Sequence, residues 1–332
     1  MKTALITGVT GQAGTYLAAL LLGKGYRVIG TTRDTKLVKR SKLDHVDVVS
    51  LDLTNCDQVT DLIDELRPDE VYHLAAPSSV ARSFGDPVKA VTGITLPGLN
   101  VLESIRKIDV RIRFLDAGSI EMFGECEVPA DEGTRLDPHS PYGVGKGSSY
   151  LQTKNYREAY GLFSCTAIFS NFESPLRPVS YVTGKIVSTV CQMAAGGDVD
   201  LALGNIGICR DWGWAPEYME AAWRMLQLDE PEDLVIATGK KHSLGEFLQI
   251  TFDAVGVNYK DHVIADPYLL RPFDIQSSVG NPARAKEVIR WSAEYSLEEL
   301  IREWVDVEMK RNWSQRTQPR NLRAMSKAGK KE

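Results

Sequence analysis

The chain has 332 residues, of which 43% are hydrophobic and 25% are charged, and its formal net charge is -5. These values are typical of a soluble globular protein with one large or two ordinary domains, and they exclude the basic footprint that nucleic acid or an anionic membrane surface requires. The five cysteines are scattered without a C-x-x-C pair and no apolar run approaches the ~20 residues that span a bilayer, so we expect a cytoplasmic protein without a metal site, a disulfide framework or a membrane partner.

Short apolar strands alternate with helix-period segments over residues 1–170, and the start, MKTALITG, is itself a strand rather than a signal peptide. Strands of this apolar character between helices are typical of a parallel sheet that is covered on both faces. We therefore predict an α/β fold, a Rossmann-type doubly wound parallel sheet. The predicted strands are 4–7, 27–32, 46–51, 70–74, 112–116 and 166–170, and the predicted helices are 15–22, 58–66 and 95–105.

The second half of the chain is less regular. Helical patterns at 182–194, 217–226, 244–254 and 297–309 are separated by proline-containing loops, and a strand is predicted at 234–238. We predict a first domain over 1–170, to which roughly 215–240 returns, and a smaller mixed α/β substrate-binding region over 171–312. Residues 313–332 are basic and lack apolar periodicity, which predicts a disordered tail.

Three glycines lie at the turn between the first strand and the first helix, in TALITGVTGQAGTYLAALL. Gly8, Gly11 and Gly14 permit a tight turn and a close approach to phosphates, and the helix N-terminus supplies N–H groups for a pyrophosphate. The spacing G-x-x-G-x-x-G is a weak signal alone, but its place in the predicted sheet is where a doubly wound fold binds dinucleotides. We predict a dinucleotide site here.

The sequence after the second strand, VIGTTRD, bears on the choice between NADP and NAD. NAD-specific sites usually carry an acidic side chain at this strand end. Here Arg33 is within reach of a 2′-phosphate, although Asp34 follows it, so we predict NADP, with NAD the less favoured cofactor. Asp52, after the third strand, is placed either to accept a hydrogen bond from adenine or to cap the next helix.

The segment HSPYGVGKGSSY places Tyr142 and Lys146 one turn apart on the same face of a helix. Ser140 and Pro141 form an N-cap and N1 pair, so we expect the helix to begin there. An ammonium at this spacing stabilises a phenolate, which predicts a lowered pKa for Tyr142 and a role as a base. Glycines at 143, 145 and 147 weaken the helix, so we expect a sheet or a cofactor to approach this face closely.

Eight blocks of sequence lie in one order along nearly the whole chain: ALITGVTGQAGTYLA, RPDEVYHLAA, SPYGVGK, NYREAYGL, NFESPLR, RDWG, VIATG and LLRP…GNPARAKEVI. Together they resemble the extended, nucleotide-sugar-modifying branch of the short-chain dehydrogenase/reductase superfamily. Within that branch they are most similar to the GDP-mannose 4,6-dehydratase family. The resemblance implies that residues 1–170 bind NADP and that the second region binds a GDP-linked sugar.

The resemblance also implies a reaction for the segment GSIEMFG, in which the residues alone leave Glu121 either a loop carboxylate or a reagent. Ser119 would hydrogen-bond the sugar 4-hydroxyl, Tyr142 would take its proton, and hydride would pass from C4 to NADP. Glu121 would remove the C5 proton and help the 6-hydroxyl leave as water, and hydride would return to C6. The product would be a 4-keto-6-deoxy sugar.

The residues that the resemblance implies fall into three overlapping sets. The catalytic residues are Ser119, Glu121, Tyr142 and Lys146. The cofactor-binding residues are Gly8, Thr10, Gly11, Gln12, Ala13, Gly14, Arg33, Asp52, Leu53, Leu74, Ala75, Ala76, Ser78, Tyr142, Lys146 and Arg177. The substrate-binding residues are Ser83, Ser119, Glu121, Asn171, Val182, Lys185, Arg210 and Arg271. Members of the branch commonly pair through the Tyr142 helix, which implies a homodimer or homotetramer.

The chain departs from the family pattern at several positions around the implied site, namely Ala13, Arg33-Asp34, Ser119, His139, Phe172 and Gly184. These departures leave open whether the glycosyl group is mannose or a close relative such as a heptose. Another extended member, a 4-epimerase, 4-ketoreductase or decarboxylase, is the alternative enzyme. A non-catalytic NADP-binding sensor or scaffold is the alternative of another class.

Overall fold

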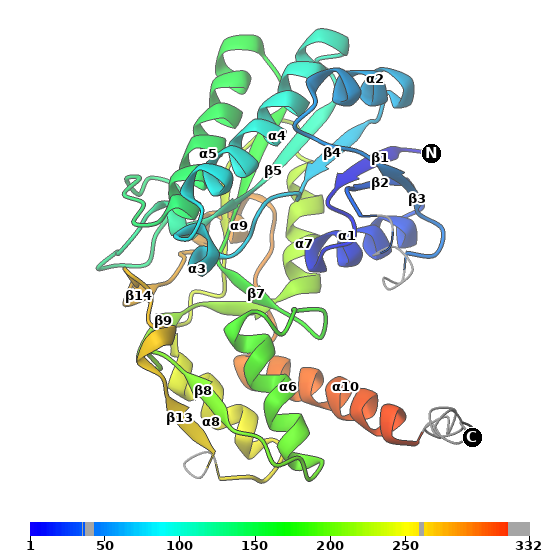
Figure 1. Cartoon of the computed structure of the whole chain (residues 1–332). Helices are drawn as coiled ribbons and strands as arrows, with labels where there is room; N and C mark the ends of the chain where they lie inside the picture. Colours follow the sequence, from blue (N-terminus) through cyan, green and yellow to red (C-terminus); the bar gives the residue numbers. More distant parts are fainter. Residues whose placement is uncertain (35, 37–42, 259–261, 318–332) are drawn as a thin grey trace, which may run out of the picture.

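The computed structural model describes residues 1–34, 36, 43–258 and 262–317, with side chains through residue 311 (Figure 1). Its main feature is a seven-stranded parallel sheet in the order β11-β6-β5-β4-β1-β2-β3. The strands are β1 (Thr3–Thr7), β2 (Arg27–Thr32), β3 (Asp47–Ser50), β4 (Glu70–His73), β5 (Arg113–Ser119), β6 (Ser164–Phe169) and β11 (Leu234–Ile236). The predicted α/β fold with a doubly wound parallel sheet is confirmed.

The strands of this sheet carry apolar residues on both faces. Helices therefore cover both faces. The helices α1 (Gln12–Gly23) and α7 (Ala215–Met225) pack on one face through a core that includes Leu17, Met219 and Leu115. The helices α2 (Cys56–Leu66) and α4 (Pro87–Ile108) pack on the other face around Phe114 and Val101, with α5 (Pro141–Tyr160) beside α4.

Three boundaries differ from the predictions in ways that affect the site. The strand β5 runs to Ser119 rather than to Asp116, so Asp116 is an interior strand residue. The helix α4 begins at Pro87, well before residue 95, because the Asp86 side chain caps it by accepting from Lys89 N. The helix α10 (Leu297–Thr317) continues into the predicted tail, and the rest of that tail, 318–332, lies outside the described residues.

A second unit packs around its own core, in the lower part of Figure 1. The helices α6 (Val182–Ala194), α8 (Leu244–Asp253) and α10 bury Ile186, Phe247 and Trp304 against one another. Short strands surround them: β8 (Leu201–Leu203) with β13 (Val263–Ala265), β9 (Cys209–Arg210) between β12 (His242–Ser243) and β14 (Ser277–Ser278), and β7 (Asn171–Glu173) with β10 (Trp212–Trp214). No described helix has the length and apolar character needed to cross a bilayer.

The remaining described elements are short. They are α3 (Val80–Ser83), the 3-10 turn η2 (Ile120–Met122) directly after β5, the 3-10 turn η4 (Pro267–Leu269) and α9 (Ala283–Val288). Strand β14 and the segment before it lie against the loop after η2, because Glu125 accepts hydrogen bonds from Gln276 N and Ser277 N at 2.6 and 3.0 Å. This contact brings the second unit to the carboxyl end of β5.

Candidate active site

The glycine turn after β1 is shaped as a cradle by close backbone approach. Gly8 has a φ of +72°, and a Cβ on it would lie 2.9 Å from Ala75 Cα. A Cβ on Gly14 would lie 2.5 Å from Gly8 O, which fixes α1 against the turn. Gly11 is the N-cap of α1 and no side chain caps the helix there. The turn therefore has the form of an anion site at a helix N-terminus, which fits the predicted pyrophosphate.

Side chains around the cradle tie it to its surroundings. The Thr7 hydroxyl accepts from Leu74 N and Ala75 N, each at 3.2 Å, and so fixes the chain after β4. The Thr10 and Thr32 hydroxyls lie 3.3 Å apart. Gln12, a predicted cofactor residue, instead bridges to the second unit: its amide donates to Phe172 O at 3.0 Å and accepts from Ser174 Oγ at 2.8 Å.

The residues predicted to select the ribose lie at the ends of β2 and β3. Arg33 is exposed directly after β2, whereas the Asp34 carboxylate accepts from Lys36 N at 2.9 Å and serves a local turn. Asp52 accepts from Thr54 N and Thr54 Oγ1, and these hydrogen bonds lower the pKa of its carboxyl. The alternative role predicted for Asp52 is to cap the next helix. That cap is Asn55, whose side chain accepts from Gln58 N.

The helix α5 begins where Ser140 and Pro141 predict it. The Ser140 hydroxyl accepts from Gly143 N at 3.0 Å, and Pro141 is at N1. The Lys146 ammonium is buried and donates to Ala117 O, and it lies 5.9 Å from the centre of the Tyr142 ring. The Tyr142 helix thus presents both side chains at the carboxyl end of β5.

The prediction of a lowered pKa for Tyr142 is wrong. Burial raises the pKa of the phenol well above its usual value, and this effect outweighs a hydrogen bond with Ser119 that lowers it. The nearby Glu121 carboxylate also raises the pKa. Desolvation therefore dominates at Tyr142.

The glycines of α5 do allow a close approach, and at two of them the neighbouring protein atoms belong to a turn and a helix rather than to the sheet. A Cβ on Gly143 would lie 2.7 Å from Glu121 O, and a Cβ on Gly145 would lie 2.9 Å from the Ile94 side chain of α4. Gly147 has no neighbour closer than 3.7 Å. The predicted crowding is therefore confirmed at two of the three positions, and the sheet is not its cause there.

Glu121 lies in η2, directly beyond β5 and next to Tyr142. Its backbone N–H donates to Ser119 Oγ at 3.3 Å, and its side chain is buried, with the residue 9% exposed. Burial raises the pKa of the Glu121 carboxyl, while the guanidinium groups of Arg210 and Arg271 lower it. A buried carboxyl group whose pKa is raised in this way is suited to acid–base chemistry.

Two predicted substrate residues reach Glu121 from the second unit. Arg210 Nε lies 3.9 Å from Glu121 Oε1, and Arg210 and Arg271 both pair with one oxygen of Asp274, at 3.1 and 3.2 Å. We call Glu121, Arg210, Arg271 and Asp274 the charged cluster. Beside it, His139 and Phe273 stack with ring centres 4.6 Å apart and enclose a cavity of about 10 Å³ against Glu121.

Three other predicted substrate and cofactor residues hold local partners. Lys185 Nζ donates to Ala202 O at 2.6 Å, Arg177 pairs with Glu173 at 2.6 Å, and Ser83 Oγ donates to Val80 O at 2.7 Å. The structure does not bring these side chains to Glu121. The remaining predicted positions fall at strand or helix ends or in the loops beside them: Ala13, Leu53, Ala76, Ser78, Asn171 and Val182.

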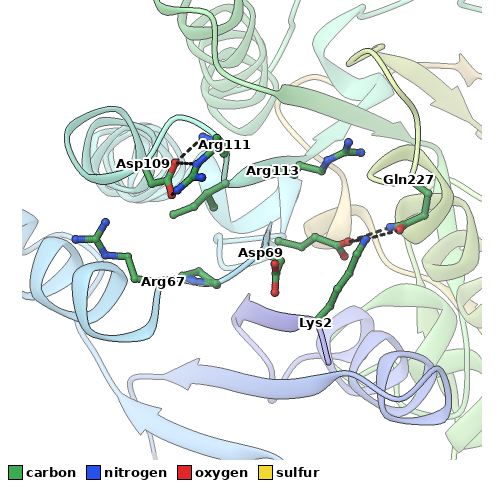
Figure 2. Close-up of a pocket in the computed structure, with 10 residues that line it drawn as sticks. Lys2, Arg67, Asp69, Asp109, Arg111, Arg113 and Gln227 are labelled. Carbon is green, nitrogen blue, oxygen red and sulfur yellow. Dashed lines mark hydrogen bonds and ion pairs between the residues drawn. The ribbon is translucent and has the colours of Figure 1, made fainter.

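A larger hollow, of about 580 Å³, lies at the opposite edge of the sheet, at the amino ends of β1, β4 and β5 (Figure 2). Its arginines are occupied by the fold, because Arg67 donates to Ile108 O at the end of α4 and Arg113 donates to Leu226 O after α7. Lys2 pairs with the buried Glu70 at 2.8 Å. These contacts satisfy carbonyl groups at two helix C-termini and the charge of a buried carboxylate. The side chains that line the hollow are therefore explained by the stability of the fold.

Sequence reasoning missed several residues of the site. Asp274 holds both arginines of the charged cluster, and only its place after the block LLRP could have suggested it. His139 was noted only as a departure, and its partner Phe273 carried no signal. The predicted strand ends at Asp116. A carboxylate within FLDAGS, in the middle of an apolar strand, in itself indicates a residue with a specific role.

The chain was compared with known proteins. A family model described as GDP-mannose 4,6 dehydratase matches residues 5–304. GDP-mannose 4,6 dehydratase 2 of Arabidopsis thaliana is 39% identical over 324 residues, which cover 93% of this chain and 87% of that protein. GDP-mannose 4,6-dehydratase of Vibrio cholerae is 37% identical over 350 residues, which cover 93% and 94%.

Solved structures share the fold at lower sequence identity. A crystal structure of UDP-glucose 4-epimerase from Thermotoga maritima, with UDP-glucose, has a TM-score of 0.83 at 23% identity and covers 94% of this chain and 99% of that chain. At this identity the likeness carries the architecture only. The family model and the two dehydratases confirm the resemblance that the eight sequence blocks predict, and the chain belongs to the GDP-mannose 4,6-dehydratase family.

Proposed function

We propose that this protein converts GDP-mannose to its 4-keto-6-deoxy product by removal of water. The observation that carries the proposal is Glu121, a buried carboxyl beside Ser119 and Tyr142 that faces two arginines. Elimination across C5 and C6 needs an acid–base group of this kind, and family membership supplies the substrate class. The 4-epimerases and 4-ketoreductases of the same fold do not need a carboxylate at this position.

The cofactor proposed is NADP, held at the glycine cradle. The residues fit the group because the α1 N-terminus carries no side-chain cap and a Cβ on Gly8 or Gly14 would collide with backbone. Arg33 is exposed at the end of β2 and the Asp34 carboxylate is engaged in a turn, which favours a 2′-phosphate over a free ribose hydroxyl. When bound, the nicotinamide takes hydride from the sugar at C4 and returns it at C6.

In the proposed first half-reaction, Tyr142 removes the proton of the sugar 4-hydroxyl while Ser119 orients that hydroxyl. The Lys146 ammonium, one turn along α5, favours the phenolate form that this step requires. Because burial raises the pKa of Tyr142, the proposal requires that polar groups of the bound substrate and cofactor replace part of the lost solvation. The sugar leaves this step as a 4-ketone.

In the proposed elimination, Glu121 takes the proton from C5, which the 4-ketone has made acidic. The same carboxyl then gives a proton to the 6-hydroxyl, which leaves as water, and a C5–C6 double bond forms. After hydride reaches C6, C5 takes a proton and the 4-keto-6-deoxy sugar is complete. The raised pKa of Glu121 supports both roles, because a higher pKa makes the carboxylate a stronger base and its acid form easier to reach.

The proposed diphosphate site uses Arg210 and Arg271 of the charged cluster. Lys185 of α6 and Asn171 of β7, both in the second unit, are proposed to complete it. Asp274 now neutralises both arginines, so the diphosphate would have to compete with this carboxylate. Residues 1–170 with 215–240 would form the cofactor domain, and 171–312 would form most of the sugar domain.

We also propose at least a homodimer through α4 and α5, with a tetramer as a further assembly. The two helices expose Leu96, Val144, Leu151 and Tyr160, each between 39% and 53%. An exposed apolar stripe on adjacent helices is a common signature of a helical interface. Light scattering on the wild type and on a Leu151→Glu variant would test it, and a monomeric wild type would contradict it.

The test of the proposed function is incubation of the purified protein with GDP-mannose and NADP⁺, followed by mass spectrometry. The proposal expects the nucleotide sugar to lose the mass of one water with wild-type protein and not with Glu121→Gln. An unchanged mass with epimerised sugar would support a 4-epimerase instead. Bound cofactor without turnover of GDP-mannose or a GDP-heptose would support a sensor or scaffold.

A further inference from the structure

A row of buried polar side chains crosses the main sheet just below its carboxyl edge. In register on β2, β1, β4, β5 and β6 lie Thr31, Thr7, His73, Asp116 and Thr166, and none is more than 3% exposed. The centre of a parallel sheet is normally apolar on both faces. A carboxylate in the middle of this row is costly to bury and needs a reason.

The helix α5 lies over the row and supplies the partners of Asp116. Ser149 Oγ donates to Asp116 Oδ2 at 2.9 Å, and Lys146, one turn earlier, donates to the carbonyl of Ala117 next to Asp116. Lys146 is itself only 6% exposed. The Cβ that a residue at Gly98 would add lies 3.4 Å from the His73 ring and 3.6 Å from Ser149 Oγ, so α4 covers the row beside α5.

The charges around Lys146 single out Asp116. Burial lowers the pKa of the Lys146 ammonium, and the Asp116 carboxylate is the group that opposes this effect. Burial lowers the pKa of His73 to about 4, so this imidazole is neutral at physiological pH. Tyr142 lies on the same helix as Lys146. Burial raises the pKa of its phenol, which is therefore neutral, and the charges of Glu121 and Arg177 also affect this pKa.

We infer that Asp116 is a positioning residue of the active site, the counter-charge that keeps the buried Lys146 ammonium protonated. The inference rests on the proposed function, in which Lys146 acts as an ammonium beside Tyr142 and the cofactor. An isolated buried ammonium tends to lose its proton, whereas a buried pair of opposite charges retains both ions. Asp116 contacts neither substrate nor cofactor and acts through Lys146.

The first test is the pH dependence of turnover in Asp116→Asn. Loss of the counter-charge lets Lys146 deprotonate earlier, so the alkaline limb of the rate profile moves to lower pH by about one unit or more. The matched control is Thr166→Val, which changes the next polar residue of the row without removing a charge, and its profile should match the wild type. An unchanged alkaline limb in Asp116→Asn would overturn the inference.

A second readout does not depend on which sugar is turned over. Protein labelled with carbon-13 at lysine Cε reports each ammonium by NMR, and the signal absent from Lys146→Met identifies Lys146. The inference expects this signal to titrate at lower pH in Asp116→Asn than in the wild type, and equal titration contradicts it. Failure with GDP-mannose alone would count against the proposed function and not against this inference.

A folding test covers the case in which Asp116→Asn is too unstable to purify. If Asp116 serves as the counter-charge, removing the charge of Lys146 as well should restore stability. The double variant Asp116→Asn/Lys146→Met is therefore expected to melt at a higher temperature than Asp116→Asn, or to fold where Asp116→Asn does not. A double variant no more stable than Asp116→Asn contradicts the inference.

Discussion

The glycine turn and the charged cluster are built in different ways. At the turn the backbone makes the site: Gly8 and Gly14 leave no room for a Cβ, and α1 carries no side-chain cap at its N-terminus. At the cluster, side chains that arrive from β9, η2 and the segment before β14 hold one another through ion pairs. One side is therefore sensitive to an added atom, and the other is sensitive to a removed charge.

The largest expected effect is on the side made by side chains. Glu121→Gln keeps the shape of the side chain and removes its acid–base chemistry, so we expect dehydration to fall about a hundred- to ten-thousandfold. Cofactor affinity, measured by titration, should stay at the wild-type value because Glu121 is not part of the glycine turn. A Glu121→Gln enzyme that dehydrates at a rate near that of the wild type would show that the carboxyl is structural.

The backbone side should fail by addition of a single methyl group. Gly8→Ala places a Cβ 2.9 Å from Ala75 Cα, whereas the matched control Gly25→Ala has a similar φ of +79° and no neighbour within 4 Å. Both variants should lose about 1 kcal/mol of stability from the left-handed backbone. Only Gly8→Ala should also lose cofactor affinity, at least about tenfold. Equal cofactor affinities in the two variants would contradict the proposal that the cradle binds the cofactor.

Arg33 is the place where the cofactor side depends on a charge. Arg33→Ala should raise the KM for NADP about tenfold and leave the KM for NAD unchanged, because a single charge-assisted contact to the 2′-phosphate is lost. Arg27→Ala, at the start of the same strand and paired with Asp47, is the control. If both cofactors weaken equally in Arg33→Ala, the arginine does not select the phosphate.

The smallest expected effect is on stability, and it has the opposite sign. Burial raises the folded-state pKa of Glu121 above its unfolded value, so its protonated form favours folding and this contribution is lost as pH rises through the folded pKa. Glu121→Gln should therefore melt about 2 °C higher than the wild type at pH 8, with the gain absent near pH 4. A lower melting temperature at pH 8 would mean that the ion pair with Arg210 outweighs burial.

The parts of the site that the sequence predicts are those that depend on neighbours in the chain. The glycine spacing, the Ser140-Pro141 cap and the one-turn spacing of Tyr142 and Lys146 are local, and each appears where expected. The sheet follows from the repeated apolar strands. The pattern predicts the elements but not their exact ends, as the end of β5 and the start of α4 show.

The parts that could not be predicted depend on tertiary contacts. The pKa direction at Tyr142 follows from burial by distant segments, and spacing along the helix carries no information about that burial. Asp274 pairs with Arg210, and Phe273 stacks on His139, across long separations in the sequence. The crowding of α5 by Ile94 likewise depends on how α4 packs.

The most direct test of the central claim, that Glu121 performs the elimination, is the reaction run in heavy water. In the proposed sequence the C5 proton leaves with the expelled water, so C5 of the product must take a new proton from the solvent. NMR of the product should show one deuterium at C5 with wild-type protein, and no product with Glu121→Gln. A product that keeps its original hydrogen at C5, or a Glu121→Gln enzyme that still places deuterium there, would contradict the account.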